Sequence, residues 1–223
     1  MSRTEKFLSL FPGDIVSFIG GGGKTTLMNA LATRLAREGR RVIVTATRPF
    51  AFRPGESPPL LPEAAGPGAF TASPGPLPGG LLAGFPPDGL PGPLAGFDYL
   101  LVEAEDARGA SLPPPAETRP VPPATTVLCA MAGLDALGPA LACRGFAGRL
   151  LAPGGLLGCR EDLERRFLLL AKADGRPARE DGARILRSLV ELAGPAARLP
   201  KVLLTSVRDF LRPVGTCAPG GSD

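Results

Sequence analysis

The sequence predicts an α/β protein in which helices cover both faces of a mostly parallel β-sheet. Short apolar runs recur along the chain, and their lack of polar alternation is typical of strands buried on both faces. Segments with apolar residues at helical spacing lie between some of these runs. The first two predicted strands are joined by a single helix, which makes a right-handed βαβ unit. Together these features predict a three-layer α/β/α arrangement.

The elements follow from the pattern of apolar residues. In the first predicted helix, residues 25–38, Leu27, Leu31 and Leu35 recur at helical spacing, and Gly39 ends the helix. Residues 178–193 form a second amphipathic segment, whereas residues 139–160 are weakly patterned. The predicted strands are residues 14–19, 41–47, 99–103, 125–132, 165–171 and 201–205.

We expect residues 1–211 to form a single domain with an irregular insertion at 48–97. Thirteen of the 27 prolines fall in that insertion, together with many glycines. Long loops of this composition are either lids over a site or disordered, and the sequence leaves both possibilities open. Residues 212–223 are expected to be a disordered tail.

Composition excludes several classes of function. The chain has no His, and its four Cys residues show no Cys-x-x-Cys spacing, so Ser-His-Asp or Cys-His catalysis and a locally built zinc site are not expected. Its formal charge of +4 is spread without a dense basic run, and a nucleic-acid partner is not expected. No apolar run approaches the roughly 18–20 residues of a membrane helix. We therefore expect a cytoplasmic protein with no membrane association.

A run of four glycines follows the first predicted strand and opens the first predicted helix. Glycines let backbone N–H groups approach an anion closely, and the helix N-terminus favours negative charge at the same point. Lys24 would reach the outer phosphates of a nucleoside triphosphate, and the Thr25 hydroxyl would bind Mg²⁺. The strict phosphate-loop motif has a glycine where Phe18 stands, but the shorter form is intact. The predicted phosphate-binding residues are Gly20, Gly21, Gly22, Gly23, Lys24, Thr25 and Thr26.

Glu103 ends the third predicted strand, where its carboxylate would lie at the same sheet edge as the glycine loop. An acid in this position can hold a Mg²⁺-bound water or orient an attacking one. Glu105 and Arg108 follow directly and would lie near the same edge. We predict Lys24, Glu103 and Arg108 as catalytic residues, and Thr25 and Glu103 as Mg²⁺ ligands.

Taken in order, five segments resemble the YqeC family of P-loop proteins, which are proposed accessory proteins of selenium-dependent molybdenum hydroxylases. The segments are 18–28 (FIGGGGKTTLM), 42–47 (VIVTAT), 100–109 (LLVEAEDARG), 115–123 (PAETRPVPP) and 133–138 (GLDALG). The resemblance implies a P-loop NTPase-like fold, binding of ATP or GTP with Mg²⁺, and a partner that is a molybdenum hydroxylase or its cofactor. It also implies a nucleotide-binding role for Thr47, at the end of the second strand.

Lys172 and Asp174 look like the Lys-x-Asp half of a guanine-reading Asn-Lys-x-Asp motif, but Ala171 stands where the asparagine would be. ATP and GTP therefore both remain open as the nucleotide. Three functions are compatible with these features. The first is a Mg²⁺-dependent NTPase or phosphoryl-transfer enzyme in hydroxylase maturation. The second is a nucleotide-gated cofactor chaperone with little turnover, and the third is a fragment of a Mur-like ATP-dependent ligase.

Overall fold

A computed structural model describes most of the chain. The described residues are 6, 8–51, 60, 66–90, 94, 96–105, 109–138, 141–172, 175–195 and 197–204. Three sequence-based expectations lie outside them: the site roles of Arg108 and Asp174, and the tail at 212–223.

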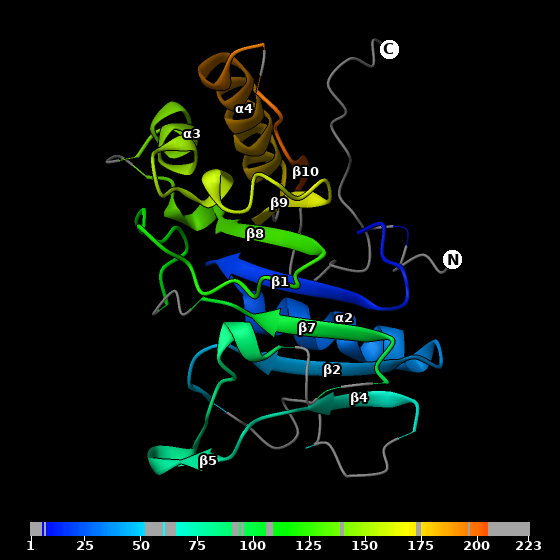
Figure 1. The fold of residues 1–223 in the computed structure, drawn as a ribbon. Coiled ribbons are helices and arrows are strands. Elements are labelled where there is room, and N and C mark those ends of the chain that lie inside the picture. The colour runs from blue at the N-terminus through cyan, green and yellow to red at the C-terminus, as the bar shows by residue number, and fades with distance from the viewer. Residues whose placement is uncertain are drawn as a thin grey trace.

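Within the described residues the main sheet has seven strands in the order β10-β9-β8-β1-β7-β2-β4. Every neighbouring pair in it is parallel, and Figure 1 shows the arrows pointing the same way. This arrangement confirms the predicted α/β class with a parallel sheet. The strands are β1 (Asp14–Gly20), β2 (Arg41–Ala46), β4 (Gly68–Thr71), β7 (Tyr99–Glu103), β8 (Val127–Gly133), β9 (Arg166–Ala171) and β10 (Lys201–Leu204).

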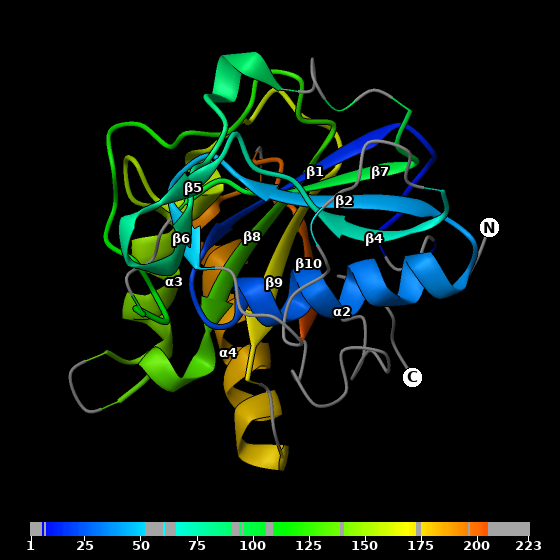
Figure 2. The same ribbon diagram turned by 90° about the horizontal axis from the view of Figure 1, so that it is seen from below.

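Helices lie on both faces of the sheet, as expected for three layers (Figures 1 and 2). Helix α2 (Lys24–Arg37) covers one face, where Leu27, Leu31 and Leu35 join the alternate strand residues Val16 and Phe18 in one apolar cluster. Helices α3 (Cys143–Leu151) and α4 (Gly175–Ala193) contribute to a second cluster on the other face. The sheet is thus buried between two apolar layers, which explains its continuous apolar strands.

The 48–97 insertion contains more regular structure than its composition predicts. Residues Gly68–Thr71 form β4, which pairs with β2 as an edge strand of the main sheet. A separate three-stranded antiparallel sheet is built from β3 (Phe50–Ala51), β6 (Leu81–Leu82) and β5 (Pro76–Leu77). Glycine and proline are tolerated at an edge strand, which has a hydrogen-bonded neighbour on one side only. Because β4 is short and follows such residues, the sequence pattern does not predict it.

Helix α3 falls in the stretch that the sequence leaves weakly patterned. Gly145 and Gly148 lower its intrinsic helix propensity, but Phe146, Ala147 and Leu150 are buried on one face. Packing of that face therefore outweighs propensity.

None of the helices in the described part of the chain is long and apolar enough to cross a membrane.

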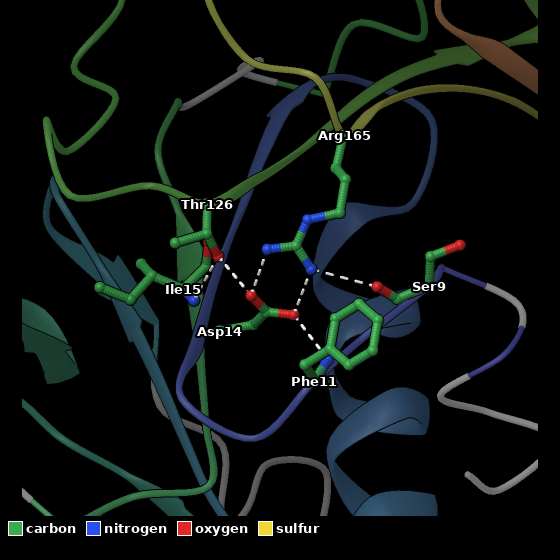
Figure 3. Close-up of polar contacts among 6 residues, drawn as sticks. All are labelled: Ser9, Phe11, Asp14, Ile15, Thr126 and Arg165. Atoms are coloured by element: carbon green, nitrogen blue, oxygen red, sulfur yellow. Dashed lines mark hydrogen bonds and ion pairs between the residues drawn. The ribbon is translucent and has the colours of Figure 1, made fainter.

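A partly buried polar cluster around the Asp14–Arg165 ion pair joins β1, β8 and β9 at their amino ends, the sheet edge opposite the glycine loop (Figure 3). The guanidinium of Arg165 donates two parallel hydrogen bonds to the Asp14 carboxylate, at 2.6 and 2.7 Å. The Thr126 hydroxyl and the Phe11 backbone N–H donate to the same carboxylate, each at 2.7 Å. Bidentate charge-assisted bonds of this kind are strong, and they fix the position at which β1 begins.

We predict that Asp14→Asn lowers the free energy of unfolding by about 2–3 kcal/mol, because Arg165 loses its ionic partner. Urea denaturation followed by circular dichroism would measure the loss as a lower midpoint with an unchanged slope. Asp162→Asn is the matched control, because Asp162 is 64% exposed and solvent screening leaves its pair with Arg160 little effect on stability. Equal midpoints for the two variants would contradict the prediction.

Candidate functional site

The glycine loop leaves the carboxyl end of β1 and turns into α2 through left-handed backbone conformations. The φ angles are +87° at Gly20, +85° at Gly22 and +111° at Gly23. Only glycine adopts such angles without a steric penalty. Gly23 is the N-cap of α2 and supplies no side chain to cap it. The first amide groups of the helix have no intrahelical partners, so this end of α2 is suited to an anion.

Lys24, Thr25 and Glu103 come together beside the loop, as the sequence predicts. The Lys24 side chain is 5% exposed; its Nζ donates to the carbonyl oxygen of Gly20 and lies 3.6 Å from Glu103 Oε1. The Thr25 hydroxyl donates to Glu103 Oε2 at 3.0 Å. The parallel register of β1 and β7 pairs Phe18 with Glu103, which places this carboxylate alongside the start of the loop.

Two further predicted site residues, Thr26 and Thr47, differ in how they lie relative to this group. Thr26 is exposed in the first turn of α2. Thr47 follows β2, and its backbone N–H donates to the carbonyl of Glu103 at 3.0 Å. Its hydroxyl oxygen is buried without a hydrogen-bond partner among the described residues. Thr47 is thus next to Glu103 in space, with a hydroxyl whose bonding capacity is unused.

Two neighbouring segments leave no room for side chains on the loop. A Cβ on Gly20 would overlap the carbonyl oxygen of Met131, and a Cβ on Gly21 would overlap that of Ala110. On Gly22 it would lie 2.7 Å from the backbone nitrogen of Gly133. The Gly21 N–H also donates to the Met131 carbonyl at 2.9 Å. The loop is therefore wedged between the end of β8 and the segment around residue 110.

The site prediction omitted two charged residues, Glu105, which contacts the loop, and Arg119, which contacts Glu105. The Gly20 backbone N–H donates to Glu105 Oε2 at 2.8 Å, and Arg119 donates to the other oxygen of the same carboxylate. The sequence indicates that Glu105 lies near this edge. Arg119 lies in the segment 115–123, one of the five that resemble the family, but the sequence assigns it no partner. Arg119 comes from a proline-rich stretch without periodicity, so only the three-dimensional structure reveals the pairing.

Lys172 belongs to a second polar group at the same edge. Its Nζ donates to Asp135 and, at 3.1 Å, to the Ser111 hydroxyl. Burial opposes ionisation of Asp135, but hydrogen bonds from Lys172 and Ser111 outweigh it, so the pKa of Asp135 lies below its usual value. The Ser111 carbonyl accepts from Gly133 at 2.7 Å. Lys172 is therefore linked to the segment that packs against the loop.

The segment that contains the glycine loop is similar in sequence to known proteins. A sequence model of the YqeC protein family matches residues 16–145, which is more than half of the chain. The chain belongs to the YqeC family. It is also similar to the "Uncharacterized protein YqeC" of Escherichia coli (strain K12), with 31% identity over 137 residues. That alignment covers 56% of this chain and 53% of the relative, so it spans about half the length of each.

The YqeC match includes the wedged loop, the Lys24–Thr25–Glu103 group and the contacts of Glu105 with Arg119. Asp135 lies within it, whereas Lys172 lies beyond its end. The family relationship therefore covers the residues that touch the glycine loop and leaves the Lys172 group outside.

We predict that Gly21→Ala lowers the free energy of unfolding by about 1–3 kcal/mol, because its methyl group would overlap the Ala110 carbonyl oxygen and push the segment around residue 110 off the loop. Thermal unfolding would measure the effect. Gly148→Ala is the matched control, since a Cβ at that α3 position meets nothing within 4 Å and alanine favours a helix. A melting temperature of Gly21→Ala at or above that of the wild type would contradict the close packing of the loop against residue 110.

Proposed function

We propose that this YqeC-family chain binds a Mg²⁺–nucleoside triphosphate, ATP or GTP, at the glycine loop and catalyses phosphoryl transfer from it. The observation that carries the proposal is the convergence of Lys24, Thr25 and Glu103 beside the uncapped N-terminus of α2. An ammonium group, a hydroxyl and a carboxylate at a helix N-terminus form the set that P-loop proteins use to bind phosphates and Mg²⁺.

Each residue has a distinct part in this reaction. The ammonium of Lys24 would move from the Gly20 carbonyl to the outer phosphates and offset the charge that develops on them. The free amides at the start of α2 would donate to the same phosphates. Thr25 and Glu103 would hold the metal, directly or through a water molecule, and when bound Mg²⁺ would neutralise phosphate charge. In hydrolysis, Glu103 would orient the attacking water.

The donor set fits Mg²⁺ because that ion is usually bound by few protein oxygens and by substrate phosphates. No cluster of three or more Cys, Asp or Glu metal ligands occurs in the described ranges. One hydroxyl and one carboxylate 3.0 Å apart therefore supply the protein part of a site that the phosphates would complete.

A second function, a nucleotide-gated cofactor chaperone with little turnover, is favoured by the packing of the loop against the segment around residue 110. A change in loop position on nucleotide binding would be passed to that segment directly. Measured release of inorganic phosphate distinguishes the two: sustained turnover supports the enzyme, and saturable binding without release supports the chaperone.

We further propose that this activity serves the maturation of a selenium-dependent molybdenum hydroxylase. That role rests on the resemblance to the YqeC family described above. A variant that does not bind nucleotide, such as Lys24→Met, is the matched inactive control for any assay of hydroxylase maturation.

We predict that Lys24→Met abolishes binding of Mg²⁺-ATP and Mg²⁺-GTP, because the variant keeps most of the side-chain volume but loses the ammonium group. Isothermal titration calorimetry with both nucleotides would measure the loss and show which base is preferred. Lys201→Met is the control. Because Lys201 is exposed on β10, this variant should bind nucleotide as the wild type does. Unchanged affinity in Lys24→Met would refute the site.

We predict that Thr25→Val removes the Mg²⁺ dependence of nucleotide binding, because valine keeps the shape of threonine without the hydroxyl that would bind the metal. Nucleotide affinity measured with Mg²⁺ and with EDTA should differ about tenfold or more in the wild type and little in the variant. Thr33→Val in the same helix serves as the control for the substitution. A variant that keeps the wild-type Mg²⁺ dependence would exclude Thr25 as a ligand.

A further inference from the structure

Charged side chains contact both of the peptide units that flank Gly20. Its carbonyl oxygen accepts from Lys24, and its N–H donates to Glu105. Gly20 has a left-handed φ of +87° and no side chain, so its orientation depends on these two contacts and on the hydrogen bond from the Gly21 N–H to the Met131 carbonyl. Lys24 would leave its contact to bind phosphate, so Glu105 would remain as the side-chain restraint.

Glu105 is itself fixed by a buried guanidinium. The Arg119 side chain is 3% exposed and that of Glu105 is 13% exposed. Arg119 also donates to the Gly154 carbonyl at 3.1 Å and to the Pro114 carbonyl at 3.3 Å. The guanidinium fork is thus tied to the backbone of two separate segments, which leaves the Glu105 carboxylate little freedom to move.

The ion pair also offsets the negative charge that Glu105 places beside the glycine loop. A lone carboxylate hydrogen-bonded to the phosphate loop would repel a triphosphate bound there. Arg119 cancels that charge at the carboxylate itself, so Glu105 can accept from the Gly20 amide without repelling the anion. A carboxylate without such a partner would lower the affinity of the loop for phosphate.

We propose that Glu105 is a positioning residue for the phosphate loop, and that Arg119 neutralises the charge of its carboxylate. The proposal rests on the proposed function, because positioning matters only if the loop binds phosphate. Glu105 acts through the Gly20 N–H: it fixes the peptide between Ile19 and Gly20 while Lys24 changes partner from the Gly20 carbonyl, in the next peptide, to the nucleotide.

Two double variants isolate the acceptor oxygen at position 105. Glu105→Ala/Arg119→Met and Glu105→Gln/Arg119→Met both remove the buried ion pair as a unit, which avoids leaving one charge buried without its partner. They differ in that glutamine keeps an oxygen that can accept from Gly20. The surface pair Arg144–Glu191, with side chains 67% and 62% exposed, supplies the control Glu191→Ala/Arg144→Met.

The first measurement is the Gly20 amide resonance in ¹H–¹⁵N spectra of each folded variant, recorded without nucleotide. We expect this resonance to shift clearly in Glu105→Ala/Arg119→Met, and to stay much closer to the wild-type position in Glu105→Gln/Arg119→Met and in the surface control. Equal shifts in the two double variants would overturn the positioning role, whether or not the chain binds nucleotide.

The second measurement is the affinity for Mg²⁺-ATP and Mg²⁺-GTP. Losing the hydrogen bond to Gly20 should weaken binding about fivefold to tenfold in Glu105→Ala/Arg119→Met, with less than about a threefold change in Glu105→Gln/Arg119→Met. Identical affinities in the two would overturn the proposal. If the wild type bound neither nucleotide, the proposed function would fail, and the Gly20 resonance alone would decide whether Glu105 orients the loop.

Discussion

The structure depends on the placement of β1, the central strand of the sheet, whose seven residues are all buried. Its amino end is held by the bidentate contact of Asp14 with Arg165, and its carboxyl end continues into the glycine loop. The neighbouring strands β7 and β8 pair with it in parallel, so their carboxyl ends meet at the same edge. A shift of β1 by one residue would exchange its two faces and misplace Gly20 relative to Glu103 and Met131.

The glycine run is explained by packing as much as by phosphate chemistry. Gly20, Gly21 and Gly22 each lie too close to neighbouring backbone for a side chain, and this constraint would hold without any ligand. The glycines alone are therefore weak evidence for nucleotide binding. The stronger evidence is the group that the loop brings together, because neither packing nor backbone geometry requires a lysine, a threonine and a glutamate to meet there.

The sequence predicts those parts of the fold and site that are set by local pattern. Strands buried on both faces, the helix after the loop and the acid at the end of β7 are each visible in short windows of sequence. Strand β4 and helix α3 are not, since one depends on pairing with β2 and the other on packing against the rest of its apolar layer. The contacts of Glu105 with Arg119 and of Lys172 with Asp135 are also not visible in the sequence, because they join residues that are 14 and 37 positions apart and all four residues lie outside the helices and strands that show a periodic pattern.

The balance of charge around the loop bears on how an anion could bind there. Among the described side chains that contact the loop or its neighbours, Lys24 faces Glu103 and Arg119 faces Glu105, so each cation is already matched by a carboxylate. An excess of basic side chains at these positions therefore cannot supply the attraction for a triphosphate. The remaining sources are the unpaired amides and dipole of α2 and a divalent cation that binds with the phosphates. The dipole of one helix end is equivalent to only about half an elementary charge, so under the proposed function we expect a metal-bound nucleotide to bind more tightly than the free anion.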